Sequence, residues 1–201
     1  MKTKILSLTL LLVALAGFTK NTYAAASAGS NYTVLNDIKA INKIEVRGNV
    51  QLFISDNATE KVTVYNKYYT ETALVQSKNG VLRISSYSPE KLIVWVSSES
   101  LRSVSAFDNA EVRSFGKVSK IEFNIDLHNN ASAKLDFNTY SANVILRDHA
   151  TIELSGMVEE FGMNRNTTSA VVNNNFAVGR NIENKIIDQT KTGREVLAGL
   201  E

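Results

Sequence analysis

Apolar and polar residues alternate along much of the middle of this chain. In 121–137 the odd positions are mostly apolar or small, whereas the even positions are mostly charged or polar. The same alternation recurs in three further segments, 104–112, 144–154 and 161–171. Neighbouring side chains of a strand point to opposite faces, so this pattern predicts β-strands with one buried face rather than helices.

The four segments align at a period of about 20 residues. A small residue takes the same place in each, at Ala110, Ala131, Ala150 and Ser169. Two positions earlier lies a set of turn-forming residues that we call the bend column, Gly48, Asp108, Asn129, Asp148 and Thr167. Glycine adopts unusual backbone angles easily, and Asp and Asn side chains bond nearby backbone N–H groups. We therefore interpret the bend column as the structural corner of a repeated coil.

The repeat predicts an all-β, single-domain parallel β-helix, or β-solenoid, with rungs of about 20 residues. A twisted antiparallel sandwich is the alternative, because alternation alone does not determine strand direction. Gly48 lies three periods before Asp108, so two less regular rungs are expected between them. The "KNG" at 78–80 predicts a tight turn, whereas 68–77 is compatible with a short helix or a loop.

The first 26 residues predict a signal peptide that is removed on export. Lys2 and Lys4 precede an apolar run and then the small residues of "TYAAAS", as in secretory signals. The run is too short for a transmembrane helix, which needs about 20 apolar residues. The remaining chain is expected in the periplasm, at the cell surface or outside the cell, with no integral membrane segment. We predict a β-solenoid domain over 27–187 and a polar tail or cap over 188–201.

The composition excludes several kinds of site and partner. The chain has no cysteine, which excludes disulfides and thiolate metal sites. Its net charge is +2, but three lysines and no acidic residue lie in residues 1–24. The mature chain therefore has no basic excess, and nucleic acid is not an expected partner.

No catalytic, cofactor-binding or metal-binding motif is recognisable, and none of these sites is expected. Asp108 and Asp148 are a candidate carboxylate pair for glycan chemistry, but their column also holds residues that are not acids, which favours a structural role. His128 and His149 are the only histidines. Two ligands are too few for a convincing zinc site, so we interpret them as surface residues rather than as a weak metal site or pH-sensitive patch.

Four tyrosines are candidates for a surface that binds a ligand, namely Tyr65, Tyr68, Tyr69 and Tyr87. Aromatic side chains are enriched at binding surfaces. The alternative is that these tyrosines cover the first, irregular rungs as part of the core or of a cap.

Several motifs resemble the head GIN domain, a family named for auto-transporter adhesins. "INKIEVRGNVQLFIS" is similar to the opening of that domain, and "NGVLRIS" and "LIVWVSSESLRSVSAFDNAEV" are similar to the stretches that follow. The similarity covers roughly residues 38–185. This chain has "DNA", "NNA" and "DHA" at bends where the family often has Gly-Ser-Gly. The resemblance implies a β-helical exported domain and supplies no catalytic residues.

The favoured function is a non-catalytic binding module of the cell envelope, whose partner is a glycan or a surface protein. A structural or assembly subunit that forms homo-oligomers through the solenoid ends is the alternative. A glycan-active enzyme is less favoured, and it would need convergent carboxylates such as Asp126 with Asp148 or Glu111.

Overall fold

The computed structural model describes residues 32–66 and 69–182. These residues form one 13-stranded sheet and one short helix, α2 (Tyr69–Thr72). The all-β prediction is therefore confirmed. The predicted signal peptide (1–26) and polar tail (188–201) lie outside the described residues. Across the part of the chain that is described, no helix has the length and apolar character needed to cross a membrane.

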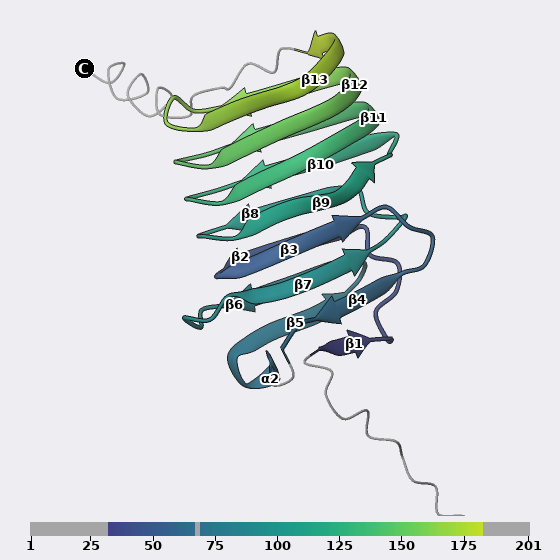
Figure 1. Ribbon diagram of the computed structural model, residues 1–201, viewed down its shortest axis with the longest axis vertical. Coiled ribbons are helices and arrows are strands. Elements are labelled where there is room, and N and C mark those ends of the chain that lie inside the picture. The colour runs from purple at the N-terminus through teal and green to yellow at the C-terminus, as the bar shows by residue number, and fades with distance from the viewer. Residues whose placement is uncertain (1–31, 67–68, 183–201) are drawn as a thin grey trace, which may run out of the picture. The chain divides into compact units, whose positions relative to one another are not determined.

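The strands in chain order are β1 (Thr33–Leu35), β2 (Lys43–Gly48), β3 (Val50–Ser55), β4 (Lys61–Val64), β5 (Ala73–Lys78), β6 (Val81–Ser86), β7 (Leu92–Ser97), β8 (Ser103–Phe107), β9 (Glu111–Val118), β10 (Glu122–Leu127), β11 (Ser132–Leu146), β12 (Thr151–Arg165) and β13 (Ala170–Ile182). Figure 1 shows them stacked above one another, with β13 at one end of the stack.

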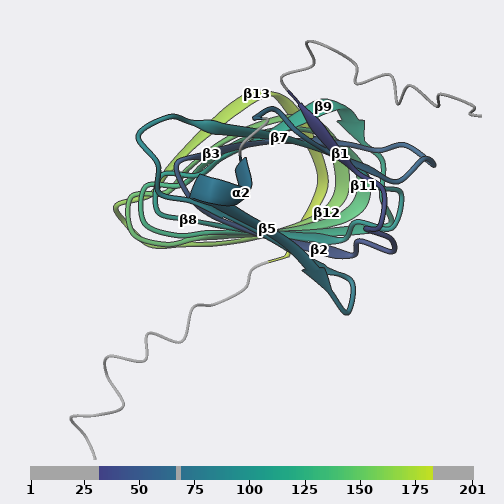
Figure 2. The same ribbon diagram turned by 90° about the horizontal axis from the view of Figure 1, so that it is seen from below.

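The sheet is curled into two limbs that face each other. The long strand β11 causes the curl, because its first half pairs with β9 and its second half with β10. One limb continues from β9 through β3 and β7 to β4 and β1, and the other continues from β10 through β8, β2 and β6 to β5. Figure 2 looks along the stack and shows β3 and β7 on one side and β2 and β8 on the other.

Most strand pairs are parallel, and from β8 to β13 they join residues about one repeat apart. Ser132 lies opposite Thr151, and Glu111 lies opposite Ser132. The small-residue positions also stack, since the Ser132 amide donates to the Ala110 carbonyl (2.9 Å) and the Thr151 amide to the Ala131 carbonyl (3.0 Å). The repeat seen in the sequence thus corresponds to neighbouring strands.

The stacking order of the first strands differs from the prediction. Strand β8 pairs directly with one edge of β2, and β9 pairs directly with one edge of β3. Strands β6 and β7 pair with the other edges of β2 and β3, respectively. The expectation of two rungs between Gly48 and Asp108 is therefore wrong. After β3 the chain leaves the repeat through β4 and β5, which pair antiparallel with β7 and β6, so that sequence order and stacking order no longer agree.

The turn predicted at 78–80 is confirmed. It joins β5 and β6 as an antiparallel hairpin, with positive φ at Asn79 (52°) and Gly80 (77°). Two successive residues with positive φ suit the right-handed twist of the flanking strands. The ambiguous stretch before it contains α2 and then β5.

The core lies between the two limbs and is built from the inward residues of the alternating strands. Fully buried side chains include Ile44, Leu52, Val94, Ile125 and Leu135. Replacing one such large side chain by Ala typically lowers the free energy of unfolding by about 2–5 kcal/mol. The outward positions of the same strands remain available for other roles.

Candidate functional site

The bend column contains four residues with a left-handed backbone. The φ angles are 79° at Gly48, 61° at Asp108, 59° at Asn129 and 58° at Asp148. Thr167 occupies a turn but is not among the positive-φ residues. A β-branched side chain disfavours that region, and in this turn the Ser169 hydroxyl donates to the carbonyl of residue 166 (2.9 Å).

Side chains of the bend column are bonded from one turn to the next. The Asp108 amide donates to Asn129 Oδ1 (3.2 Å), and the Asn129 amide donates to Asp148 Oδ2 (3.0 Å). The Tyr87 hydroxyl donates to Asp108 Oδ2 (3.1 Å), and this hydrogen bond raises the pKa of Tyr87. Both aspartates therefore accept hydrogen bonds at the bends, Asp108 from Tyr87 and Asp148 from the Asn129 amide.

The histidines lie near the same bends. The His128 ring stacks on Phe107 with centroids 4.6 Å apart, and its Nε2 lies 3.0 Å from Asp126 Oδ1. The Arg47 guanidinium covers Phe107 at 3.7 Å. Within the described residues, no group of three or more His, Cys, Asp or Glu side chains is placed to hold a metal ion.

The carboxylates that a glycan-active enzyme would need are engaged elsewhere. Asp126 faces His128 in the second limb, whereas Glu111 lies in β9 of the first limb. Glu111 accepts hydrogen bonds from Lys91 and from Gln51 Nε2 (3.1 Å), and the Lys91 bond lowers the pKa of Glu111.

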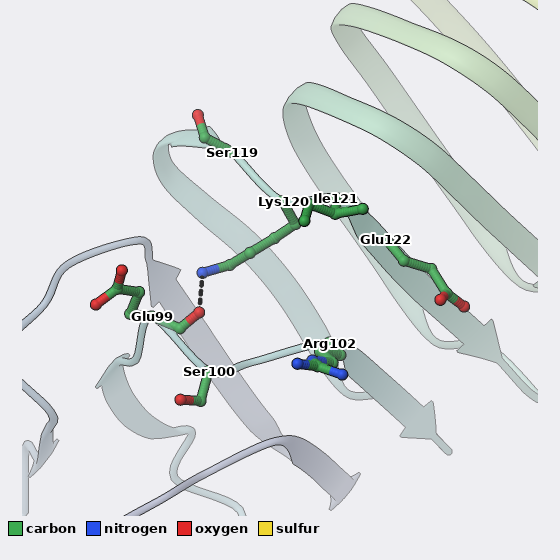
Figure 3. Close-up of a pocket in the computed structure, with 7 residues that line it drawn as sticks. All are labelled: Glu99, Ser100, Arg102, Ser119, Lys120, Ile121 and Glu122. Carbon is green, nitrogen blue, oxygen red and sulfur yellow. Dashed lines mark hydrogen bonds between the residues drawn. The ribbon is translucent and has the colours of Figure 1, made fainter.

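A hollow of about 490 Å³ lies between the loops at 99–102 and 119–122. Figure 3 shows Glu99 and Glu122 on opposite sides of it. The Lys120 side chain is 9% exposed; its Nζ donates to the Glu99 carbonyl (2.5 Å) and pairs with Asp56. This buried lysine holds the loops together rather than facing a ligand.

The most distinctive surface is a row of aromatic side chains that we call the aromatic face. It comprises Tyr32, Phe53, Tyr65, Trp95 and Phe115. Ring centroids are 5.8 Å apart for Tyr32–Tyr65 and 6.4 Å for Tyr65–Trp95. Trp95 stacks on Phe53 at 4.7 Å and meets Phe115 at 5.0 Å.

The strand register explains why these rings meet. Trp95 of β7 lies directly opposite Phe53 of β3. Both occupy outward positions between buried neighbours such as Val94 and Leu52. The row therefore crosses the outside of the first limb on a hydrogen-bonded sheet.

A β-bulge brings Phe115 to this row. Between β9 and β11 the register shifts from Arg113↔Lys134 to Lys117↔Asp136, so that 114–116 lie opposite a single residue. Gly116 provides the required positive φ (80°), and the Ser114 hydroxyl accepts a hydrogen bond from the Asp136 amide (2.9 Å). The bulge leaves Phe115 63% exposed. Bulges often re-aim side chains in this way at functional sites.

A groove of about 390 Å³ adjoins Phe115. Its charged lining residues are Arg113, Lys134 and Asp136, and Ser114 and Ser155 contribute hydroxyl groups. Aromatic rings and polar groups thus border one another on the first limb.

The four candidate tyrosines have different positions. Tyr65 belongs to the aromatic face, Tyr87 is 72% exposed beside Asp108, and Tyr69 packs α2 against the core. Tyr68 lies outside the described residues. Sequence reasoning missed Phe53 and Phe115 as surface residues. Phe53 could have been found, because it occupies an outward position in the alternation of β3. Phe115 could not, because the bulge interrupts the alternation there.

One protein family matches this sequence over residues 40–181, and its description reads "Putative auto-transporter adhesin, head GIN domain". That range includes every strand from β2 to β12 and nearly all of β13. No curated protein matches the chain.

Several crystal structures share the fold. One, described as a "putative adhesin" from Parabacteroides merdae, is 16% identical, covers 76% of this chain and 75% of its own, and has a TM-score of 0.57. A second "putative adhesin", from Parabacteroides distasonis, is 18% identical, covers 76% of each chain and has a TM-score of 0.56. A "putative lipid binding protein" from the same organism is 9% identical, covers 78% of this chain and 98% of its own, and has a TM-score of 0.52.

Proposed function

Because this chain belongs to the head GIN domain family, we propose that it is an exported, non-catalytic binding domain of the cell envelope that binds its partner through the aromatic face. It would act in the periplasm or at the cell surface. The observation that carries the proposal is the continuous contact of five aromatic rings on the outside of the sheet.

A contiguous group of aromatic residues outside a core often marks a binding surface. Burying Trp, Tyr or Phe side chains contributes strongly to binding, because each ring removes a large area from water. A surface built on paired strands is also already ordered, so little conformational entropy is lost when a ligand binds.

We also propose that the curled sheet is a parallel β-helix with rungs of about 20 residues. The parallel pairs β10–β11 and β11–β12 support this fold, as do the equivalent bends at Asp108, Asn129 and Asp148. The antiparallel strands at the β1 and β5 end would then form a cap on the helix.

The partner class is a glycan or a surface protein, and the experiment separates these from lipid. Purified polysaccharides, envelope proteins and lipid vesicles would be tested for retention by the immobilised protein. The variants Trp95→Ala and Phe115→Ala should lose at least about tenfold in affinity, which corresponds to 1.4 kcal/mol.

Tyr140→Ala is the matched control, because Tyr140 is an exposed aromatic residue of β11 that bonds to Glu160 (3.3 Å) away from the aromatic face. It should bind like the wild type. Equal retention of a ligand by the wild type and both aromatic-face variants would refute the proposal.

A second candidate is an assembly subunit that forms homo-oligomers. Strand β13 supports it, because β13 pairs only with β12 among the described strands. An unpaired strand edge is a template for pairing with another chain. Sedimentation over a range of protein concentrations tests this alternative, which predicts a mass that rises with concentration.

A further inference from the structure

We propose that the aromatic face and the adjoining groove bind a polysaccharide of uronic acids, with sugar rings on the aromatic rings and carboxylates at Arg113 and Lys134. This inference rests on the proposed function and specifies its ligand class.

The outward residues form one file across five strands. Trp95 of β7 lies opposite Phe53 of β3, and Phe53 lies opposite Arg113 of β9. Arg113 in turn lies opposite Lys134 of β11, which lies opposite Glu153 of β12. The file therefore changes from aromatic at β7 and β3 to cationic at β9 and β11, and it ends in the acidic Glu153 of β12.

The spacing of this file suits an extended glycan. Adjacent strands are about 4.8 Å apart, which is close to the advance of one pyranose residue along an extended polysaccharide. A chain laid across the strands would place successive sugars over successive side chains. The apolar C–H faces of the sugars would meet Trp95 and Phe115, and their hydroxyls would reach Ser114 and Ser155 of the groove.

Arg113 retains hydrogen-bonding capacity for a carboxylate. Its side chain is 49% exposed, and its Nη2 lies 3.6 Å from Glu111 Oε2, beyond hydrogen-bonding distance. Glu111 is already bonded by Lys91 and Gln51. A guanidinium has five N–H donors and binds carboxylates in a bidentate manner, so a uronate can bind Arg113 without displacing the Glu111 contacts.

Lys134 extends the cationic half of the file. Its side chain is 61% exposed, and Nζ lies 2.6 Å from Glu153 Oε1. Glu153 also accepts a hydrogen bond from Asn174 (2.6 Å), so it remains bonded if Lys134 turns towards a ligand.

Asp136 is the acidic residue of the groove, and its position matters because it would repel a uronate. Its Oδ1 lies 2.5 Å from the place that a Cβ on Gly156 would occupy, which means that this oxygen points towards β12. The carboxylates of the ligand are therefore expected on the Arg113 side of the groove.

The test uses oligogalacturonates and their fully methyl-esterified forms, which share a backbone but differ in charge. Calorimetry should show at least about tenfold tighter binding of the acidic form, or 1.4 kcal/mol. Arg113→Gln should reduce this preference at least fivefold. Arg83→Gln is the matched control, since the Arg83 side chain is 47% exposed and pairs with Glu45 (3.1 Å) in β2 of the other limb.

The outcomes separate this inference from the proposed function. Equal binding of both forms, or no effect of Arg113→Gln, overturns the uronate inference, as does failure to bind any oligogalacturonate. In each of these cases the proposed function stands if Trp95→Ala abolishes binding of another ligand. Ligand binding that is unaffected by every aromatic-face variant overturns both.

Discussion

At the scale of single residues, the bends require an unusual backbone conformation and local acceptors at the same time. Asp108, Asn129 and Asp148 all have φ near +60°. Asp and Asn tolerate this region better than most residues, because their short polar side chains bond nearby backbone groups. The need for Asp or Asn at these bends is therefore explained by the backbone conformation and the local hydrogen bonds.

Asn129 provides a direct test of the backbone contribution. Asn129→Ala loses the acceptor for the Asp108 amide and keeps the unfavourable φ, whereas Asn129→Gly loses only the acceptor. We expect the Ala variant to be less stable than the Gly variant by about 1 kcal/mol in denaturant unfolding.

Thr167 is the control for this comparison, because its φ is not positive. At Thr167 the order should reverse, with Gly about 0.5–1 kcal/mol less stable than Ala. The same order at both positions would contradict the assignment of strain to the bend column.

Glu60 should make stability depend on pH in the acidic range. It accepts hydrogen bonds from the Ala40 amide (2.6 Å), the Ile41 amide (2.7 Å) and the Ser98 hydroxyl (3.1 Å). Burial alone would raise the pKa of Glu60, but these donors outweigh burial and lower it. The resulting stabilisation is complete above the unfolded-state pKa of about 4.3 and is lost as pH falls through the lower folded-state pKa.

We therefore expect Glu60→Gln to reduce the free energy of unfolding by about 2 kcal/mol at pH 7. The difference from wild type should shrink as unfolding is measured at successively lower pH below about 4. Glu90→Gln, at an exposed position, should have little effect. A Glu60 effect of constant size from pH 7 to pH 2 would show that its charge is not involved.

At the scale of elements, alternation predicted the strands well because burial on one face dictates it. Ile44, Leu52 and Leu135 could be assigned to the core from their phase alone. The bulge at 114–116 could not, because it interrupts the alternation and depends on the pairing partner. Phe115 therefore entered the aromatic face only once the register between β9 and β11 was known.

Lys120 tests how the loops between elements are held together. It is nearly buried and pairs with Asp56, whose Oδ2 also accepts the Ser119 amide (2.9 Å). Lys120→Met would leave the partly buried Asp56 carboxylate without its cation, and we expect a loss of about 3 kcal/mol in thermal or denaturant unfolding.

The double variant Lys120→Met/Asp56→Asn should recover part of that loss, because it removes the unpaired charge. Lys117→Met, at an exposed position of β9, should be close to neutral. A neutral Lys120→Met variant would mean that the pair contributes nothing to the loops.

At the scale of the whole molecule, periodicity indicated neighbouring strands for the later part of the chain but failed for its beginning. A fixed period assumes that the chain adds strands in one direction only. The chain instead leaves the repeat after β3 and returns to pair β6 and β7 on the far side of β2 and β3. This detour also creates the contact of Trp95 with Phe53, so the site depended on the order that the sequence pattern missed.

The central claim is that ligand binds on the aromatic face, and Trp95 reports on this face because it is the only tryptophan in the chain. The most direct measurement is acrylamide quenching of its fluorescence, with and without saturating amounts of a ligand retained by the immobilised wild-type protein. Bound ligand should cover Trp95 and reduce the quenching constant at least twofold, and Tyr140→Ala should show the same reduction as the wild type. Saturating ligand that leaves Trp95 quenching unchanged would place binding elsewhere on the protein and contradict the account.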